Sequence, residues 1–317
     1  MLPYKDFPTI GEGNTPMIQV KNLCEELGLK NLWIKNEGQN PTGSHKDRMS
    51  PLIIARAKSI GMESVAVASS GNAGASIAAY AAAGDVECIV LTTESMNPIW
   101  KQAIEKTGAT IVYTKEAMKR WELMKGNVEN GIWYPATNFI NPPVGSNPFG
   151  VQGYKTIAYE IIEDSEEIPN IIIVPCSRGD LLWGIWEGFK EVFDAGMIHS
   201  LPRLIAVEPF PRLKKVLEGQ PYVDSFIGDS TYTPSVGGIT VTYQALKAIQ
   251  ESNGEVVVIP SHQAETEQKH LGKHGIYAER SSSLVVGALK YLIKKQAIQE
   301  EDKILLLISS NGYKELF

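Results

Sequence analysis

The chain has 317 residues, of which 43% are hydrophobic and 21% are charged, and this composition predicts a globular protein with one large or two smaller cores. Its formal net charge of −6, from 36 acidic and 30 basic residues, argues against a nucleic-acid partner, because such a partner needs a basic surface. Three widely spaced cysteines fit neither a disulfide framework nor a metal motif. We find no apolar leader and no apolar span of about 18 residues, so we expect a cytoplasmic protein without membrane contact.

Strand-like and helix-like segments alternate along the chain, which predicts an α/β fold with mainly parallel sheets. The expected elements of the first half are a strand at 64–68, a helix at 73–83, a strand at 88–91, a helix at 98–106, a strand at 109–113 and a helix at 116–124. The expected elements of the second half are a strand at 171–174, a helix at 181–189, and strands at 204–207, 256–259 and 304–308.

An Asn/Pro-rich segment, residues 141–148, separates these two sets of elements. Such clusters break regular structure and often mark a crossing between domains. We therefore expect two open, twisted α/β domains with the active site in the cleft between them. The smaller domain would span 50–140, and the larger would combine 1–49 with 141–317 and carry the loop at 176–180.

The segment 38–48 carries the strongest chemical signal of the chain. Its Pro-Thr-Gly-Ser turn delivers Lys46, with Asp47 and Arg48 directly behind it. A lysine in a turn is usually a solvated surface group, but a buried lysine amine has a lowered pKa and becomes a nucleophile. The neighbouring loops decide between these two interpretations.

Three further polar loops follow expected strands, where open α/β sheets bind ligands. In the loop at 69–72, hydroxyls and backbone N–H groups at a helix N-terminus suit an anion, and Asn72 suits a phenolic oxygen. The loop at 176–180 suits a phosphate, with Arg178 as an added cation and Asp180 as a helix cap. In the loop at 309–312, a hydroxyl suits an unprotonated pyridine nitrogen.

Each loop alone has a simpler explanation, such as an ordinary helix cap or a polar turn. Their joint occurrence with Lys46, in this order, predicts a pyridoxal-phosphate enzyme. The chain resembles the fold-type II pyridoxal-phosphate enzymes, and among them most closely the threonine synthases. The segments that carry the resemblance are 13–16, 37–48, 69–75, 152–158, 275–279 and 311–315.

The resemblance implies a role for each loop. Lys46 would form the Schiff base with the cofactor and then move protons, and Asn72 would contact the cofactor's 3′-oxygen. Ser309 would face the pyridine nitrogen, which then stays neutral and favours elimination and replacement over transamination. The substrate carboxylate would be held by Ser69, Ser70 and Ala73. The cofactor phosphate would be bound by Cys176, Ser177, Arg178, Gly179 and Asp180.

The chain departs from the threonine synthase pattern at several positions. Gly150 stands where the family usually has an arginine that holds the substrate phosphate, and Gln152 replaces a glutamate. The loss of a bidentate phosphate ligand bears directly on the substrate. His45 replaces a common phenylalanine, and we favour a packing role for it over an acid–base role.

Two other features have simpler explanations than a functional one. His270 and His274 are spaced i, i+4 on an expected helix near Glu267, which could suit a metal, but flanking lysines favour a solvated helix face and we expect no metal. Trp183 and Trp186, on the helix after the 176–180 loop, are expected in the core.

The leading function is that of a threonine synthase-like lyase of amino-acid biosynthesis, converting O-phosphohomoserine and water to threonine and phosphate. The alternative is a related β-replacement or elimination/deamination enzyme acting on serine, threonine, O-phosphoserine or O-acetylserine, including one of specialised metabolism. A third candidate binds the cofactor without turnover, against which the retained Lys46 argues. The resemblance also implies a homodimer.

Overall fold

The structure is a computed structural model that describes residues 1–140 and 142–315. The described strands are β1 (Met17–Gln19), β2 (Asn31–Asn36), β3 (Ser64–Ala68), β4 (Glu87–Thr93), β5 (Thr110–Thr114), β6 (Tyr134–Pro135), β7 (Ile171–Pro175), β8 (Arg203–Glu208), β9 (Glu255–Val258) and β10 (Lys303–Ile308). The described α-helices are α1 (Lys21–Leu27), α2 (Lys46–Ser59), α3 (Asn72–Ala83), α4 (Pro98–Lys106), α5 (Ala117–Glu129), α6 (Pro148–Val151), α7 (Lys155–Asp164), α8 (Asp180–Asp194), α9 (Leu213–Leu217), α10 (Tyr243–Glu251), α11 (Ala264–Lys273) and α12 (Arg280–Lys294). Short 3₁₀ turns are η1 (Glu37–Gln39), η2 (Gln152–Tyr154), η3 (Pro234–Val236) and η4 (Ser261–Gln263).

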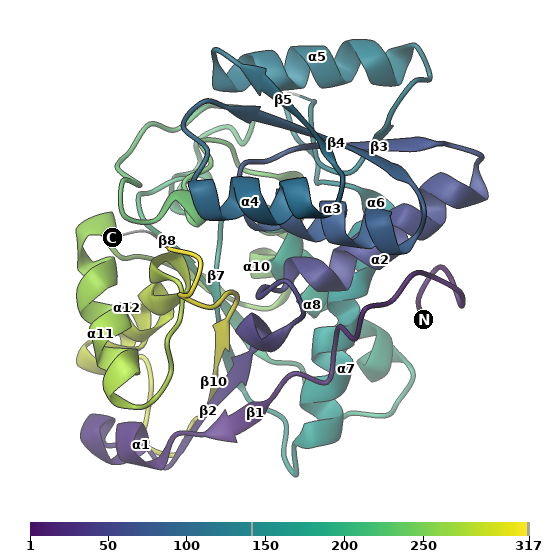
Figure 1. Ribbon diagram of the computed structural model, residues 1–317. Coiled ribbons are helices and arrows are strands. Elements are labelled where there is room, and N and C mark those ends of the chain that lie inside the picture. The colour runs from purple at the N-terminus through teal and green to yellow at the C-terminus, as the bar shows by residue number, and fades with distance from the viewer. Residues whose placement is uncertain (141, 316–317) are drawn as a thin grey trace.

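The strands form two sheets, which confirms the expected α/β class (Figure 1). The larger sheet has the strand order β1-β2-β10-β7-β8-β9 and the smaller one β5-β4-β3-β6. Every pairing is parallel except that of β1 with β2. No helix in the described part of the chain has both the length and the apolar character needed to cross a bilayer.

Both faces of the larger sheet are buried, as is usual for parallel strands. Side chains alternate along β10, so Leu305 and Leu307 join a core with α7, α8 and α10. The intervening Ile304, Leu306 and Ile308 join a second core with α1, α11 and α12. These two groups of helices lie on opposite sides of the sheet in Figure 1.

The smaller sheet is linked to the larger one by helix α2. On one face of the smaller sheet, Val65 and Val67 share a core cluster with Ile172 and Val174 of the larger sheet. Helix α2 packs against α3 on one side and against α6 and η2 on the other, so it lies between the two sheets. The other face of the smaller sheet is covered by α5, whose Met124 is fully buried.

All expected strands and helices are present and differ from the expectation only at their ends. Strands β1, β2 and β6 were not expected. Residue Asn141, at the expected domain boundary, lies outside the described residues, and the division into 50–140 and the remainder stays a prediction.

Candidate active site

The four polar loops converge because of the strand order. β2, β10 and β7 are neighbours in the larger sheet, so the segments that follow them leave the same edge. The His45 backbone N–H donates to the Ser309 carbonyl at 2.9 Å, and the Asn311 N–H donates to the Gly43 carbonyl at 3.1 Å. The loop after β3 joins them through the Ser310 hydroxyl, which lies 3.3 Å from Asn72 Oδ1.

Lys46 is the first residue of α2, and its amine points to a buried hydroxyl. Lys46 Nζ donates to Tyr154 Oη at 3.0 Å, and the Tyr154 hydroxyl donates to Met49 Sδ at 2.8 Å. Burial lowers the pKa of Lys46; the charge of Asp180 opposes this shift, while that of Arg178 adds to it. The 176–180 loop follows β7, the neighbour of β10 in the larger sheet. An amine with a lowered pKa can act as a nucleophile.

The turn that carries Lys46 is held by Asp47, which is fully buried. The Asp47 carboxylate accepts hydrogen bonds from the Thr42 N–H at 2.6 Å and from the Ser76 hydroxyl at 2.6 Å. Since Ser76 lies on α3, this carboxylate joins the lysine turn to the helix that follows the 69–72 loop. Asp47 is therefore a structural link behind the amine.

The loop at 69–72 leads into α3 without a side-chain cap. Gly71 is the N-cap residue, so the simpler explanation, a Ser or Asn side-chain cap, is wrong here. The first turn of α3 thus keeps N–H groups that suit an anion. Ser70 Oγ lies 3.5 Å from an Arg120 guanidinium nitrogen, Ser69 is half-buried and Ala73 is buried.

Asn72 already has partners on both atoms of its amide. Its Nδ2 donates to Glu279 Oε2 at 2.9 Å, and its Oδ1 accepts from Lys314 Nζ at 2.7 Å. The amide is therefore held in one orientation by residues that come from two distant segments.

The loop at 176–180 has the features of a phosphate site. Gly179 has φ of +87°, and a Cβ there would lie 2.3 Å from Ala245 Cβ, so this position requires glycine. α8 begins after it without a side-chain cap, which leaves N–H groups for an anion. Cys176 is buried and Ser177 is half-buried.

The two charged residues of this loop, Arg178 and Asp180, have different surroundings. Asp180 was expected to cap α8, but this is wrong, because its carboxylate accepts from the Ser146 N–H at 2.9 Å and hydroxyl at 2.8 Å. The Arg178 guanidinium lies 5.0 Å from the centroid of the Trp121 ring, and its Nε is buried without a hydrogen-bond partner in the described part of the chain. Burial lowers the pKa of Arg178. A buried, incompletely paired guanidinium suits an anionic ligand.

Ser309 and His45 are in direct contact at the site. Ser309 Oγ lies 2.8 Å from Ser282 Oγ, and the Ser309 carbonyl lies 3.0 Å from His45 Nδ1. A carbonyl can only accept, so Nδ1 carries the proton of this imidazole. Burial lowers the pKa of His45 well below its usual value, so the ring is neutral. The Tyr154 ring packs against it at 5.5 Å between centroids, an arrangement that fits a packing role.

Tyr154, Glu279 and Lys314 contact site residues, and sequence reasoning had assigned them no function. All three lie in segments that resemble the family, and this resemblance is the sequence signal that could have identified them. Lys314 Nζ donates to the carbonyls of Thr42 and Gly43 at 3.2 and 2.8 Å. Burial lowers the pKa of Lys314 to about 8. The site therefore contains a second amine with a perturbed pKa, held beside Asn72.

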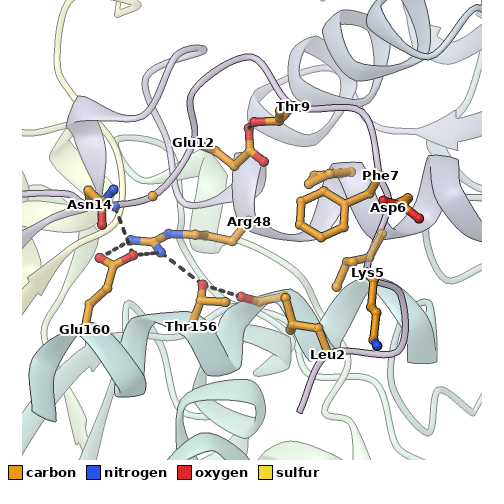
Figure 2. A pocket seen from close by; sticks show the side chains of 14 residues that line it. Leu2, Lys5, Asp6, Phe7, Thr9, Glu12, Asn14, Arg48, Thr156 and Glu160 are labelled. Carbon is orange, nitrogen blue, oxygen red and sulfur yellow. Dashed lines mark hydrogen bonds and ion pairs between the residues drawn. The ribbon is translucent and has the colours of Figure 1, made fainter. Parts of the chain in front are cut away.

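Arg48 belongs to a separate network on the other side of α2. Its guanidinium donates to Glu37 Oε1 and to Glu160 Oε2, both at 2.8 Å, and to the Thr156 hydroxyl at 3.0 Å. Figure 2 shows Arg48 between Glu160 and Thr156, with Asn14 beside them. An adjacent pocket of about 480 Å³ lies under the N-terminal segment 2–14. Among the described residues, neither Lys46 nor the loops at 69–72, 176–180 and 309–312 line it.

Gly150, at the position of the family's usual arginine, is surrounded by the packing between α6 and α2. It is buried in α6, where a Cβ would lie 2.7 Å from both Ile53 Cγ1 and Ile53 Cδ1 of α2. A side chain at this position would thus point into the packing between α6 and α2. A larger residue at this position would therefore require Ile53 to move. Gln152 is half-buried in the following turn.

The expectation for the two tryptophans is confirmed. Trp186 is 2% exposed and belongs to the main core, and its indole N–H donates to Glu251 at 2.8 Å. Trp183 is half-buried and packs against the same core.

A known family matches almost the whole chain. Its description is "Pyridoxal-phosphate dependent enzyme", and the match covers residues 8–310. The chain belongs to this family. Its members use pyridoxal phosphate, and the residues at the site fit that cofactor. Lys46 supplies an amine that hydrogen-bonds a neutral hydroxyl, the uncapped α8 with Arg178 suits the phosphate, and Ser309 supplies a buried hydroxyl.

Curated relatives of the chain include several threonine synthases. The protein from Methanocaldococcus jannaschii is 31% identical over 99% of this chain and 79% of its own length. The protein from Halalkalibacterium halodurans is 28% identical over 97% of this chain and 84% of its own length.

Solved structures with the same fold carry more varied names. Threonine deaminase isoform 2 from Solanum lycopersicum, in its processed form, has a TM-score of 0.79 at 20% identity and covers 94% of this chain and 83% of its own. An O-ureido-L-serine synthase has a TM-score of 0.75 at 18% identity, covering 95% and 90%. Serine racemase from Dictyostelium discoideum has a TM-score of 0.74 at 24% identity, covering 95% and 93%. At these identities the likeness shows the fold alone.

Proposed function

We propose that the chain is a threonine synthase-like lyase that converts O-phosphohomoserine and water to threonine and phosphate. The observation that carries the proposal is the Lys46 amine, which hydrogen-bonds the buried Tyr154 hydroxyl where the loops at 38–48, 69–72 and 309–312 meet. Curated threonine synthases that match nearly the full length of the chain support the substrate.

In this proposal the large-sheet loops hold the cofactor. The phosphate lies against the N-terminus of α8, among Cys176, Ser177, Arg178, Gly179 and Asp180. Lys46 attaches the cofactor, Asn72 contacts its 3′-oxygen and Ser309 faces its ring nitrogen. When bound, the cofactor withdraws electrons from the substrate and acidifies its Cα proton. The neutral hydroxyl of Ser309 leaves the ring nitrogen unprotonated, which favours elimination and replacement over transamination.

The small-sheet loop holds the substrate in this proposal. The substrate carboxylate lies at the N-terminus of α3, against Ser69, Ser70 and Ala73, where uncapped N–H groups and the Arg120 guanidinium favour a negative charge. Lys46 then faces the substrate's α-carbon and moves protons. Burial lowers the pKa of this amine, which favours its use as a proton carrier.

The decisive experiment supplies O-phosphohomoserine to purified, cofactor-loaded protein. We expect release of phosphate and formation of threonine in equal amounts. If neither forms, although borohydride reduction attaches the cofactor to Lys46, the substrate assignment is rejected while the cofactor assignment stands.

A second candidate keeps the cofactor and changes the substrate. Gly150 favours it, because this chain has glycine where threonine synthases usually have the arginine that holds the substrate phosphate. A β-replacement or elimination/deamination of serine, threonine, O-phosphoserine or O-acetylserine is then expected. Turnover of one of these four without turnover of O-phosphohomoserine would select it.

A spectral titration with the same amino acids separates both candidates from a protein without turnover. Any enzyme of this class changes the absorbance of the bound cofactor when its substrate arrives. An unchanged spectrum with every amino acid would favour the non-catalytic alternative.

We also propose a cytoplasmic homodimer with domains at 50–140 and at 1–49 plus 141–317. Light scattering on the purified protein tests the dimer. Limited proteolysis tests the domains, since cleavage near residue 141 is expected before cleavage inside either sheet.

A further inference from the structure

Two histidines and a glutamate from different helices lie together on the outer side of the larger sheet. His270 lies in the last turn of α11, His274 is its C-cap residue, and Glu26 lies on α1. Glu26 Oε1 lies 2.8 Å from His270 Nε2, and Glu26 Oε2 lies 3.1 Å from His274 Nε2. The three ligand atoms are all within 4.8 Å of one another.

These histidines do not form the solvated helix face that the sequence suggested. Their side chains are only 10% and 9% exposed, while the neighbouring Lys269 side chain is 72% exposed. Residues four apart share one face of a helix, and here that face is turned toward α1. Figure 1 shows α1 and α11 next to each other on this side of the sheet. The expectation of solvated imidazoles is therefore wrong.

His270 provides an independent observation that points to a ligand. Both of its ring nitrogens are buried and lack a hydrogen-bond partner within the described residues. Its Nε2 is close to Glu26 Oε1, yet the pair does not meet the geometry of a hydrogen bond. A buried polar nitrogen in this state requires an explanation. A cation bound between the imidazoles and the carboxylate supplies one.

The surroundings of His270 also resemble those of metal-bound histidines. Such histidines usually have a carboxylate near the other ring nitrogen. Here Glu267 Oε2 lies 3.9 Å from His270 Nδ1 and is fixed by Lys290 Nζ at 2.7 Å. The Glu267 side chain is itself only 8% exposed, so the second carboxylate is part of the same buried cluster.

We propose that Glu26, His270 and His274 bind one Zn²⁺ ion, which joins α1 to α11. Two imidazoles and one carboxylate suit zinc, whereas Ca²⁺ and Mg²⁺ prefer oxygen ligands. Zinc–ligand bonds of about 2.0–2.2 Å place neighbouring ligands of a tetrahedral shell about 3.3 Å apart, close to the two separations measured here. The exposed side of Glu26 leaves the fourth position open to water.

The test adds Zn²⁺ to untagged, metal-free, cofactor-loaded protein. Isothermal titration calorimetry is expected to give one site per chain. Zinc at about 100 times its Kd should raise the Tm by several degrees, because it binds the folded state and joins two helices. Co²⁺ in place of zinc should give the intense visible absorption of a tetrahedral site.

Matched variants locate the ion. Glu26→Gln, His270→Asn and His274→Asn should each weaken Zn²⁺ binding at least about tenfold and abolish the rise in Tm. Glu25→Gln, on α1, and His262→Asn, in η4 just before α11, change exposed residues outside the cluster and should bind zinc like the parent protein. Each metal-free variant is first checked for a cooperative unfolding transition. If one of the three ligand variants does not fold, the other two still test the site.

Two results would overturn the proposal. One is zinc binding that survives in all folded ligand variants, since the ion would then lie elsewhere. The other is a parent protein that binds zinc no more tightly than the ligand variants do. Catalytic activity plays no part in either measurement, so both are independent of the proposed reaction.

Discussion

Lys46 and Arg48 are two residues apart on α2, and their surroundings shift the pKa values of their side chains in opposite directions. The Lys46 amine hydrogen-bonds a neutral hydroxyl, and burial lowers its pKa. Burial alone would also lower the pKa of Arg48, but the carboxylates of Glu37 and Glu160 overcome this and raise it. Burial without a carboxylate partner lowers the pKa of a cationic side chain and favours reactivity. A cationic side chain paired with two carboxylates keeps its charge and stabilises the fold. This difference in partners separates the face of α2 where we propose the chemistry, its chemical face, from its structural face.

The largest expected effect is that of Lys46→Ala on activity. Removal of the amine should lower turnover at least about 10³-fold, because both the covalent attachment and the proton carrier are lost. Peptide mass mapping after borohydride reduction should find no cofactor on α2. The Tm should stay close to that of the parent protein, and a variant that fails to fold would contradict the contrast with Arg48.

Arg48→Ala is the matched change on the structural face. It leaves the buried Glu37 without its cation and leaves Glu160 paired with Lys35 alone, which should cost roughly 3–5 kcal/mol of unfolding free energy. Urea denaturation of the two alanine variants measures the contrast directly. Equal stability of both variants would show that the Arg48 network does not hold the fold.

The same network predicts a pH dependence of stability. Burial would raise the pKa of Glu160, but hydrogen bonds and charge from Arg48 and Lys35 lower it to about 2. Its stabilisation is therefore fully present above the unfolded pKa of about 4.5 and is lost as the pH falls toward 2. Glu160→Gln should remove roughly 2 kcal/mol of this dependence, after allowance for its partial exposure. Urea titrations of both proteins across this range provide the measurement.

Tyr154→Phe tests the neutral partner on the chemical face. It removes the hydroxyl that orients Lys46 Nζ and should lower kcat about 10- to 100-fold, with a small change in KM. A changed pH profile of kcat, at unchanged Tm, would distinguish positioning of the amine from a packing defect. An unchanged kcat would show that the Tyr154 hydroxyl does not position Lys46 for the reaction.

His45→Phe should have the smallest effect. The His45 ring is neutral and holds a backbone carbonyl, so its loss should lower kcat less than about tenfold and leave the pH profile from about pH 6 to about pH 8 unchanged. If kcat of the variant no longer rose or fell with pH in this range as it does in the parent protein, His45 would have an acid–base role.

Sequence reasoning predicted the elements whose patterns are local. The apolar strand β3 and the polar turn after it were recognised because both signals lie in neighbouring residues. Strand β2 was missed because it carries Lys35 in its interior. That lysine is fully buried only because Glu160, distant in sequence, pairs with it at 2.8 Å. Such a pairing cannot be read from the strand itself.

The contacts of the site depend on approaches between distant segments. Tyr154 reaches Lys46 because α8 packs closely at Gly184, where a Cβ would lie 2.4 Å from Tyr154 Cβ. The surroundings of Gly150 have the same origin, because the space beside it depends on the position of Ile53 on α2. Likewise, the buried state of His270 depends on α1. Motifs predicted which residues gather, and packing determined their partners.

The central position of β10 in the larger sheet has a consequence for biosynthesis. β10 lies between β2 and β7, although more than a hundred residues separate it from β7 along the chain. During translation, β2 and β7 leave the ribosome without the strand that joins them. The sheet can close, and the lysine turn can find its partners at Ser309 and Asn311, only after residue 311 has emerged. A nascent chain shorter than this should be unable to retain its coenzyme.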